Sequence, residues 1–427
     1  MSSFRRKIYL LLSIACGSLI LAIFVLTPPK QMETPKVTLV TSRWSGPHAD
    51  YQKKLLERYS RETGVQVNQD DVDFGQLRTK QTMNMANKTG GYDVIWVLES
   101  WIEDYVKAGH IIPLNPYFEK APGFDIKNYM PGLVKLNTYD GKVYGIPTMV
   151  QTAIVAYDKR KLQEAGFGPP NTWDEILAVA RHFKAQGSGI AMPVRKGMFD
   201  DNIWDTLMYS NDGSYLDAQG NLRLDCVENI ETLEFYQKLM QYALKGSLDW
   251  HVDEANKQLQ FGHAPIGITI SGLAGILDDP ERSTIAGHVG YLPLPYKTHP
   301  AGIVSVWNWC IPADSKHPED AMKLIAWLTS SAVEKEQSLT NGQLSAVNSL
   351  FYDIELRSKF PFLPAVITYL NNPHTPLVAP HGKELMDGIT EILFRVSVSP
   401  VDPAEELKQL QQKMQPHFGK SVVEPGR

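Results

Sequence analysis

Cysteine is scarce in this chain, which has only Cys16, Cys226 and Cys310 among its 427 residues. Such sparse use excludes a disulfide framework, although the sequence leaves open whether Cys226 and Cys310 pair. Metal-ligand patterns are also lacking, because no Cys-x-x-Cys or His-x-x-x-His spacing occurs and the 11 histidines are scattered. We therefore expect neither a metal nor a cofactor.

An excess of basic residues is missing as well. The chain has 42 Lys and Arg residues against 47 Asp and Glu residues, for a net charge of −5. The first 30 residues hold four basic residues and no acid, so the remainder carries 38 basic against 47 acidic residues, or −9. This balance argues against nucleic acid and anionic lipid as partners. The length, with 43% hydrophobic and 21% charged residues and no low-complexity tract, is typical of a globular protein with two lobes.

Residues 1–30 are predicted to be a signal peptide or a membrane anchor. Three basic residues at positions 5–7 precede residues 8–26, which carry no charge and are about long enough to span a bilayer as an apolar helix. Positive charge in front of this helix predicts a cytoplasmic N-terminus and an exported body. A lipoprotein-like cleavage site at Cys16 has serine where leucine is usual, so we favour an uncleaved anchor or an ordinary signal over lipidation.

The body of the chain alternates strands with helices. Strands are expected at residues 37–42, 65–71 and 92–98, and helices at residues 49–63 and 76–89. Repeated β-α-β units with short connections predict an α/β fold with a mostly parallel sheet and helices on both faces. Ligands of such sheets sit beyond the carboxyl ends of the strands. That rule selects Trp44, Ser45, Glu99 and Trp101 as candidates.

A central stretch, residues 141–162, is interpreted as a crossing between two domains. Asp140 and Gly141 form a hairpin-turn pair, and residues 149–157 are apolar, β-branched and aromatic enough to predict a strand. Pro147 cannot donate a hydrogen bond within a sheet, so it marks an edge, a bulge or a change of sheet. An ordinary hairpin is the alternative interpretation.

Helices dominate the later part of the chain. Thr172 and Glu175 have the spacing of a capping box, which predicts that a helix begins there. Further helices are expected at 226–244, from about residue 318, and at 384–394 and 403–414, with strands ending at 270 and covering 302–311.

The order of short motifs resembles a known family. These motifs are Tyr-Asp-Val-Ile-Trp at 92–96, Gly-His-Ile-Ile-Pro-Leu at 109–114, Gly-Lys-Val-Tyr-Gly-Ile-Pro at 141–147 with Tyr-Asp-Lys at 157–159, Ala-Gly-Phe at 165–167 with 170–175, Phe-Gly-His-Ala at 261–264, and residues 315–321 and 399–406. Together they resemble the bacterial extracellular solute-binding proteins of ABC importers, in the sugar-binding branch that includes maltose- and trehalose-binding proteins. The resemblance covers about residues 36–418.

This resemblance implies a bilobal periplasmic-binding-protein (Venus flytrap) fold, in which the chain crosses between two α/β lobes three times. Lobe 1 is expected at residues 36–148 with 305–350, and lobe 2 at residues 149–304 with 351–427, with hinge rotation near residues 148–151. Closure around a sugar, disaccharide or glycosylated osmolyte would signal to the transmembrane subunits of an ABC permease. We expect a monomer in the periplasm or at the cell surface, where an uncleaved N-terminal segment would tether it to the cytoplasmic membrane.

The resemblance also suggests which residues line the cleft. They are Trp44, Ser45, Glu99, Trp101, Gln151, Trp204, Asp205, Gly272, Trp307 and Asn308. Trp101, Trp204 and Trp307 are expected to stack on the apolar face of a sugar, and Glu99 and Asp205 to accept hydrogen bonds from hydroxyl groups.

Alternatives remain for several of these residues. Trp101 can instead cover the edge of the core, Asp205 can be a solvated carboxylate near a helix start, and only one of Trp307 and Trp309 can face the cleft. Ser305 and Val306 stand where many sugar binders of this type have a Gly-Gly pair.

Two other functions compete with solute import. Paired carboxylates such as Asp200 and Asp201, or Glu99 and Asp205, occur in glycoside hydrolases, but no accompanying catalytic motif supports an enzyme. A periplasmic sensor subunit that uses the same fold to signal to a membrane kinase is the second alternative.

Overall fold

The computed structural model describes residues 37–45, 48–197, 199–370, 373–377, 379 and 381–418. The predicted signal peptide or anchor at residues 1–30 lies outside these ranges. Within them, no helix is both long enough and apolar enough to cross a membrane.

A single eight-stranded sheet extends through the molecule in the order β2-β1-β3-β10-β6-β8-β7, with β9 pairing alongside β6. The strands are β1 (Thr38–Trp44), β2 (Gln66–Val72), β3 (Val94–Leu98), β6 (Ile146–Asp158), β7 (Ile190–Ala191), β8 (Ile266–Ile270), β9 (Val289–Leu292) and β10 (Val304–Cys310). A separate hairpin consists of β4 (Thr138–Tyr139) and β5 (Lys142–Val143).

The prediction of a mostly parallel sheet is wrong, because four of the seven strand pairings of this sheet are antiparallel. β1 pairs in parallel with β2 and β3, and β7 with β8, but β10 is antiparallel to β3 and β6, and β6 is antiparallel to β8 and β9. The early β-α-β units are formed by neighbouring segments, so local sequence patterns predict the parallel pairing of β1, β2 and β3. The antiparallel pairs join segments that are far apart in the chain, so no local pattern specifies their direction.

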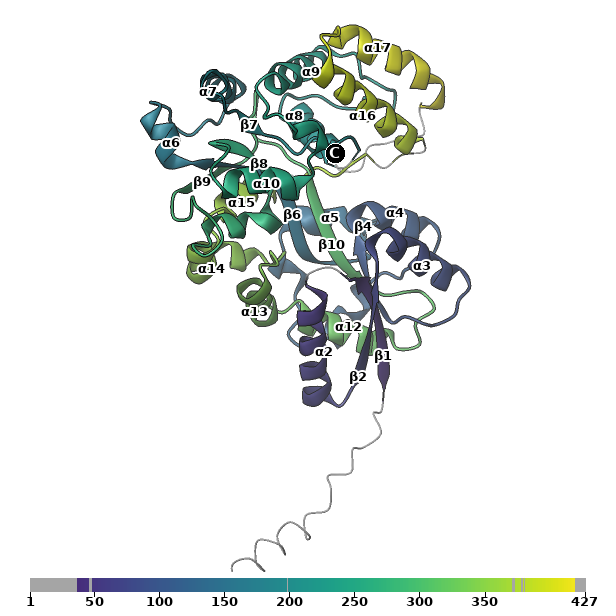
Figure 1. Ribbon diagram of the computed structural model, residues 1–427. Helices are drawn as coiled ribbons and strands as arrows, with labels where there is room; N and C mark the ends of the chain where they lie inside the picture. Colours follow the sequence, from purple (N-terminus) through teal and green to yellow (C-terminus); the bar gives the residue numbers. More distant parts are fainter. Residues whose placement is uncertain are drawn as a thin grey trace, which may run out of the picture.

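Two bodies lie on either side of the central strands β6 and β10, as Figure 1 shows. We call the body with β1 to β3 lobe 1. It also contains α2 (Ala49–Thr63), α3 (Phe74–Ala86), α4 (Glu99–Lys107), α5 (Pro131–Leu136), α12 (Pro318–Leu328) and α13 (Ser331–Asn341). We call the other body lobe 2. It contains α6 (Lys159–Glu164), α7 (Trp173–Ala185), α8 (Asp200–Tyr209), α9 (Val227–Met240), α10 (Val252–Gln260), α11 (Ser271–Ala274), α16 (Gly382–Val398) and α17 (Pro403–Met414).

Local signals explain why several helices begin and end where they do. The predicted capping box is confirmed, because Thr172 accepts from the backbone N–H of Glu175 and the Glu175 carboxylate accepts from the backbone N–H of Thr172. Helix α2 ends at Gly64, whose φ of 75° is the left-handed conformation that glycine adopts without a steric penalty. Its buried face carries Leu55, Leu56 and Tyr59.

The stretch interpreted as a crossing forms β6, which pairs first with β10 and then with β8 and β9. The hairpin before it turns at Asp140 and Gly141, whose φ values of 49° and 71° are both positive, as a tight hairpin turn requires. Pro147 pairs with Asn308 next to a register shift in β10, so the proline stands at an irregularity. From Ala153 onward, β6 leaves β10 and pairs with β8 and then with β9.

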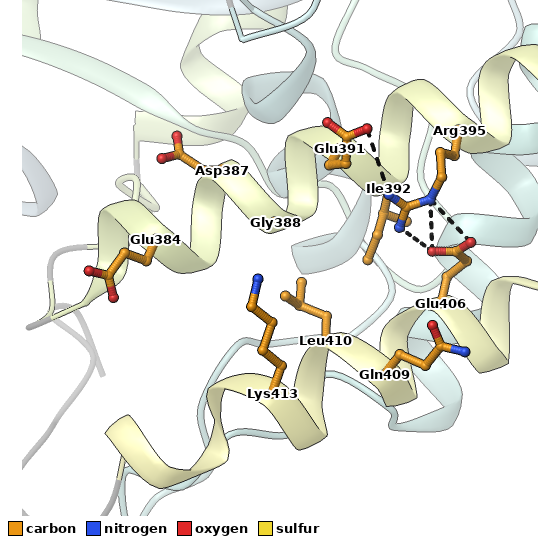
Figure 2. A pocket seen from close by; sticks show the side chains of 10 residues that line it. All are labelled: Glu384, Asp387, Gly388, Glu391, Ile392, Arg395, Glu406, Gln409, Leu410 and Lys413. Atoms are coloured by element: carbon orange, nitrogen blue, oxygen red, sulfur yellow. Dashed lines mark hydrogen bonds and ion pairs between the residues drawn. The ribbon is translucent and has the colours of Figure 1, made fainter.

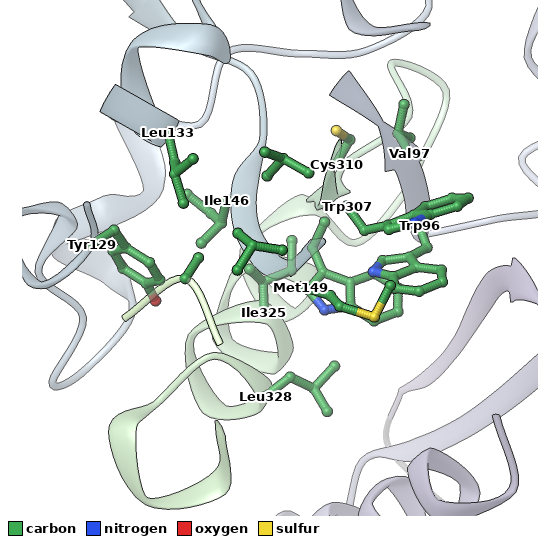
Figure 3. Packing of buried hydrophobic residues seen from close by; sticks show 14 of the residues in the cluster. Trp96, Val97, Tyr129, Leu133, Ile146, Met149, Trp307, Cys310, Ile325 and Leu328 are labelled. Carbon is green, nitrogen blue, oxygen red and sulfur yellow. The ribbon is translucent and has the colours of Figure 1, made fainter. Parts of the chain in front are cut away.

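Two large hydrophobic cores fill the lobes, and a smaller one lies beside β8. Figure 3 shows part of the lobe 1 core, where Trp96 and Trp307 pack side by side near Met149, Ile325 and Leu328. Helices α14 (Ile354–Lys359) and α15 (Leu363–Leu370) also contribute to this core. The sequence predicted residues 351–427 to lie in lobe 2, but only the later part, with α16 and α17, packs into the lobe 2 core.

The segment predicted as a hinge is hydrogen-bonded to Leu344 and Ala346, which belong to the lobe 1 core. The backbone N–H of Val150 donates to Leu344 (3.0 Å), and that of Ala346 donates to Thr148 (3.0 Å). The Thr148 hydroxyl donates to the carboxyl group of Glu334 at 2.6 Å. Burial raises the pKa of Glu334 to about 8, so this carboxyl group is largely protonated at neutral pH.

Candidate functional site

Five aromatic rings gather at the carboxyl ends of β1, β2 and β3. We call Trp44, Phe74, Trp96, Trp101 and Trp307 the aromatic cluster. Trp307 stacks on Trp96 with ring centroids 4.2 Å apart and lies nearly parallel to Trp44 at 6.3 Å. Phe74 and Trp101 contact it edge-on, at 6.2 and 5.8 Å. Trp307 is only 4% exposed, whereas Phe74 is 50% exposed and Trp44 is half-buried.

Phe74 and Trp44 therefore present the open aromatic surface of this cluster. The prediction that Trp307 is a stacking plate does not match this conformation, because four neighbouring rings enclose it. Trp101 is 8% exposed and sits between Phe74 and Trp307, with the guanidinium of Arg78 5.9 Å from its ring. Its position agrees with the alternative that it covers the edge of the core.

Glu99 is the first residue of α4 and is buried. Its carboxylate accepts from the backbone N–H of Val306 at 2.7 Å, which ties α4 to β10. Burial raises the pKa of Glu99 to about 7, although backbone N–H groups at the helix start partly oppose this shift. One carboxylate oxygen is thus already engaged inside lobe 1. Its partner Val306 belongs to the Ser305–Val306 pair, which stands where many sugar binders of this type have two glycines.

Gln151 and Gly272 come together, as expected for residues near the crossing. A Cβ atom on Gly272 would lie 2.8 Å from Nε2 of Gln151, so a side chain at position 272 would displace that amide. The neighbouring Ser271 hydroxyl accepts from the backbone N–H of Thr152 (3.2 Å), which fixes α11 against β6. Gln151 is half-buried, and Ser45, which follows β1, is exposed.

Trp204 and Asp205 lie inside lobe 2, apart from the aromatic cluster. Trp204 on α8 is 1% exposed and belongs to the lobe 2 core. Asp205 is also 1% exposed, and its carboxylate accepts from the Tyr215 hydroxyl. Neither side chain presents the open surface that the predicted stacking and hydroxyl-binding roles require. The alternative of a solvated carboxylate at Asp205 fails for the same reason.

Asn308 differs most clearly from its predicted role at the cleft. Its Nδ2 donates to the carbonyl groups of Val97 (3.3 Å) and Val306 (2.9 Å), and its Oδ1 accepts from Asn137. The residue is fully buried. Because residues of lobe 1 bond both ends of the buried amide, Asn308 links β10 to β3 inside the lobe.

Known proteins match most of this chain. A family model described as bacterial extracellular solute-binding protein matches residues 45–335, which is more than half of the chain. The chain belongs to this family.

Individual relatives of this solute-binding protein are distant but cover most of its length. A probable amino-acid ABC transporter periplasmic-binding protein of Sinorhizobium fredii is 25% identical over 352 residues, covering 80% of this chain and 79% of the relative. An ABC transporter solute-binding protein of Agrobacterium radiobacter K84, solved with ribitol, is 26% identical with a TM-score of 0.75 and covers 90% of this chain and 99% of that one. Maltose-bound MalE3 of T. maritima, at 21% identity, has a TM-score of 0.76 and shares the fold over 89% of this chain and all of its own.

Phe74 is a residue of the solute-binding protein that the sequence did not single out. It begins α3 directly after Asp73, whose side chain accepts from the backbone N–H of Gly75 and caps the helix. The rule that selected Trp44 and Glu99 also applies to the carboxyl end of β2, so the signal for Phe74 was present.

A groove of about 510 Å³ between α16 and α17 contains none of the predicted site residues of the solute-binding protein. Figure 2 shows that Arg395 on α16 joins the two helices through Glu406 on α17 and also contacts Glu391 on its own helix, while Lys413 projects into the groove. Among the described residues, no group of His, Cys, Asp or Glu side chains could hold a metal ion. Cys226 and Cys310 are free thiols, so they do not pair.

Proposed function

We propose that this protein is the extracytoplasmic binding component of an ABC importer and that it carries a sugar, disaccharide, polyol or glycosylated osmolyte to a membrane permease. The family match over residues 45–335 carries the proposal. The relatives that bind ribitol and maltose support the solute class, and so does an aromatic surface at the carboxyl edge of lobe 1.

The proposed solute lies between the lobes, against Trp44 and Phe74. Aromatic rings pack against the C–H groups of a saccharide, and the Gln151 amide supplies hydrogen bonds to its hydroxyl groups. Hinge rotation near residues 148–151 closes lobe 2 over the solute, and the closed form docks on the permease. The named relatives are binding proteins, and we propose binding rather than catalysis for this chain as well.

The proposed location is outside the cytoplasmic membrane, because the family is extracellular. A tether formed by residues 1–30 remains a prediction, and a sensor subunit for a membrane kinase is the alternative use of the same fold. Neighbouring permease and ATPase genes would support import, whereas a neighbouring histidine kinase gene would support sensing.

Thermal unfolding of the purified full-length protein tests the proposal. Mono- and disaccharides, polyols, glucosylated osmolytes, amino acids and divalent metal ions are added one at a time. A ligand that binds only the folded state adds about 2.7 kcal/mol at a hundred times its dissociation constant. We expect a compound of the saccharide or polyol class to raise the melting temperature. A shift with an amino acid or a metal alone would contradict the proposed solute class.

Variants then test the proposed surface. Phe74→Ala and Trp44→Ala should weaken binding of the active compound by about tenfold each, since each removes a contacting ring. Phe261→Ala is the matched control, because Phe261 is 49% exposed on lobe 2 and contacts none of the aromatic cluster. Equal affinity in all three variants and the unmodified protein would rule out the aromatic cluster as the binding surface.

A further inference from the structure

A buried guanidinium stands directly behind the aromatic cluster. Arg43 is the penultimate residue of β1 and is 0% exposed. Its Nε donates to the carbonyl oxygen of Trp44 (3.1 Å), its Nη1 donates to Oε1 of Gln52, and its Cζ lies 4.3 Å from the ring centroid of Trp96. Its Nη2 has no acceptor in the described part of the chain. One face of the guanidinium is therefore occupied, and one donor remains unsatisfied.

The positive charge of Arg43 also lacks a partner of opposite sign. Asp71 is the carboxylate whose charge acts on Arg43, but Asp71 forms its ion pair with Lys53 at 2.5 Å and accepts from Gln69. In the ranges that the structure describes, no carboxylate makes an ion pair with Arg43. Burial lowers the pKa of Arg43 to about 9, so the group is still charged at neutral pH. A buried and unpaired charge is costly, which indicates that an anion completes this site.

Two amide groups add further unused donors. Gln52 directs its oxygen to Arg43, so its outward atom is the Nε2 donor, and that atom has no acceptor in the described chain. Asn341 uses its oxygen to accept from the backbone N–H of Gln343 (3.1 Å), and its Nδ2 is likewise without an acceptor there. His48 interacts with both Arg43 and Asn341, which brings α2, β1 and the end of α13 together. Burial and the Arg43 charge lower the pKa of His48 to about 4, so it is neutral at pH 7.

We propose that Arg43, Gln52 and Asn341 form a site for a small monovalent anionic group. Three N–H donors and one guanidinium charge, with the one carboxylate that acts on Arg43 (Asp71) ion-paired to Lys53, match the needs of a carboxylate or a halide ion. The anion comes from one of two sources, the carboxylate of an acidic saccharide or free chloride. The acidic saccharide rests on the proposed function, because it makes the solute itself anionic. Free chloride as the source does not depend on the proposed function.

Thermal unfolding of the full-length protein in rising sodium chloride or bromide tests the halide source. Arg43→Met removes the guanidinium at similar side-chain length, and Asn341→Ala removes one donor while Arg43 remains. Arg58→Met is the matched control, because Arg58 also lies over an indole, that of Trp327 at 5.0 Å, but is paired with Glu336 at 2.7 Å. We expect a saturable rise in melting temperature that persists in Arg58→Met and weakens about tenfold or more in the two site variants.

The carboxylate source is tested by comparing acidic saccharides with their neutral counterparts, such as glucuronate with glucose and galacturonate with galactose. If the solute supplies the anion, the acidic form binds more tightly, and Arg43→Met removes this preference by about tenfold or more. Crystals grown in sodium bromide give an independent measurement, since bromide scatters anomalously. A peak beside Arg43 supports the halide source even if Arg43→Met does not fold.

The proposal is overturned if Arg43→Met and Asn341→Ala respond to halides and acidic saccharides as the unmodified protein does. It is also overturned if no bromide peak appears and acidic saccharides bind no more tightly than their neutral counterparts. Its failure is distinct from failure of the proposed function. Neutral sugars that bind without any anion effect would uphold the function and remove this site. Halide binding without binding of any saccharide or polyol would uphold this anion site and contradict the proposed function.

Discussion

Trp307, which the sequence suggests as a stacking residue, packs among other aromatic rings in this conformation. It lies at the carboxyl edge of lobe 1, yet four other rings surround it and leave it 4% exposed. We expect Trp307→Ala to lower the free energy of unfolding by about 3–5 kcal/mol, because it leaves a large cavity in the core. Phe74→Ala should cost less than about 1 kcal/mol, since the Phe74 ring is half exposed. Urea unfolding measures both, and equal costs would contradict this difference in packing.

Glu99 makes the stability of the protein depend on pH. The pKa of its carboxyl group is about 7 in the folded protein against the usual 4.5, so the folded state holds the proton more tightly. The stabilisation is fully present below pH 4.5 and is lost as the pH rises through about 7, by about 3 kcal/mol. Glu99→Gln should flatten the thermal stability profile over this interval. Glu103→Gln on the same helix is the control, and a profile left unchanged by Glu99→Gln would contradict the assignment.

At the scale of single elements, the hairpin before β6 depends on two left-handed residues. Gly141 has a φ of 71°, and no atom lies within 4 Å of the position that a methyl group on its Cα would take, so only backbone strain opposes a side chain there. Gly141→Ala should therefore reduce the free energy of unfolding by about 1 kcal/mol. Gly168→Ala is the matched control, since Gly168 has equally open space and no positive φ. Chemical denaturation measures both variants, and an equal effect would exclude strain as the cause.

Elements with local signals were predictable, and those that depend on distant pairing were not. Helix α17 covers residues 403–414 as predicted, because Pro403 starts it and Asp402 caps it. The antiparallel direction of β10 was not readable, since its partners β3 and β6 lie far away in the chain. The same limit applies to the site. The strand-end rule selected Trp44 and Glu99 as candidates, but the hydrogen bonds of Asn308 to Val97 and Asn137 join residues that are remote in sequence.

At the scale of the whole molecule, ligand binding should make the protein more compact. Only one strand, β6, carries the first crossing, and the Thr148–Glu334 hydrogen bond lies at the predicted pivot. Small-angle X-ray scattering should show a smaller radius of gyration when the active solute is added, as closure of two lobes requires. Phe74→Ala at the same solute concentration is the control with reduced occupancy. An unchanged radius at saturating solute would contradict closure.

The position of β10 between β3 and β6 has a consequence for the synthesis of the protein. A ribosome makes β3 and β6 long before it reaches β10, so the growing chain carries two strand edges whose backbone groups have no partner. Such edges promote aggregation and pairing with other chains. A polypeptide that stops short of residue 304 cannot close this gap. Lobe 1 is therefore completed only when β10 has been made, although its sequence begins near the N-terminus.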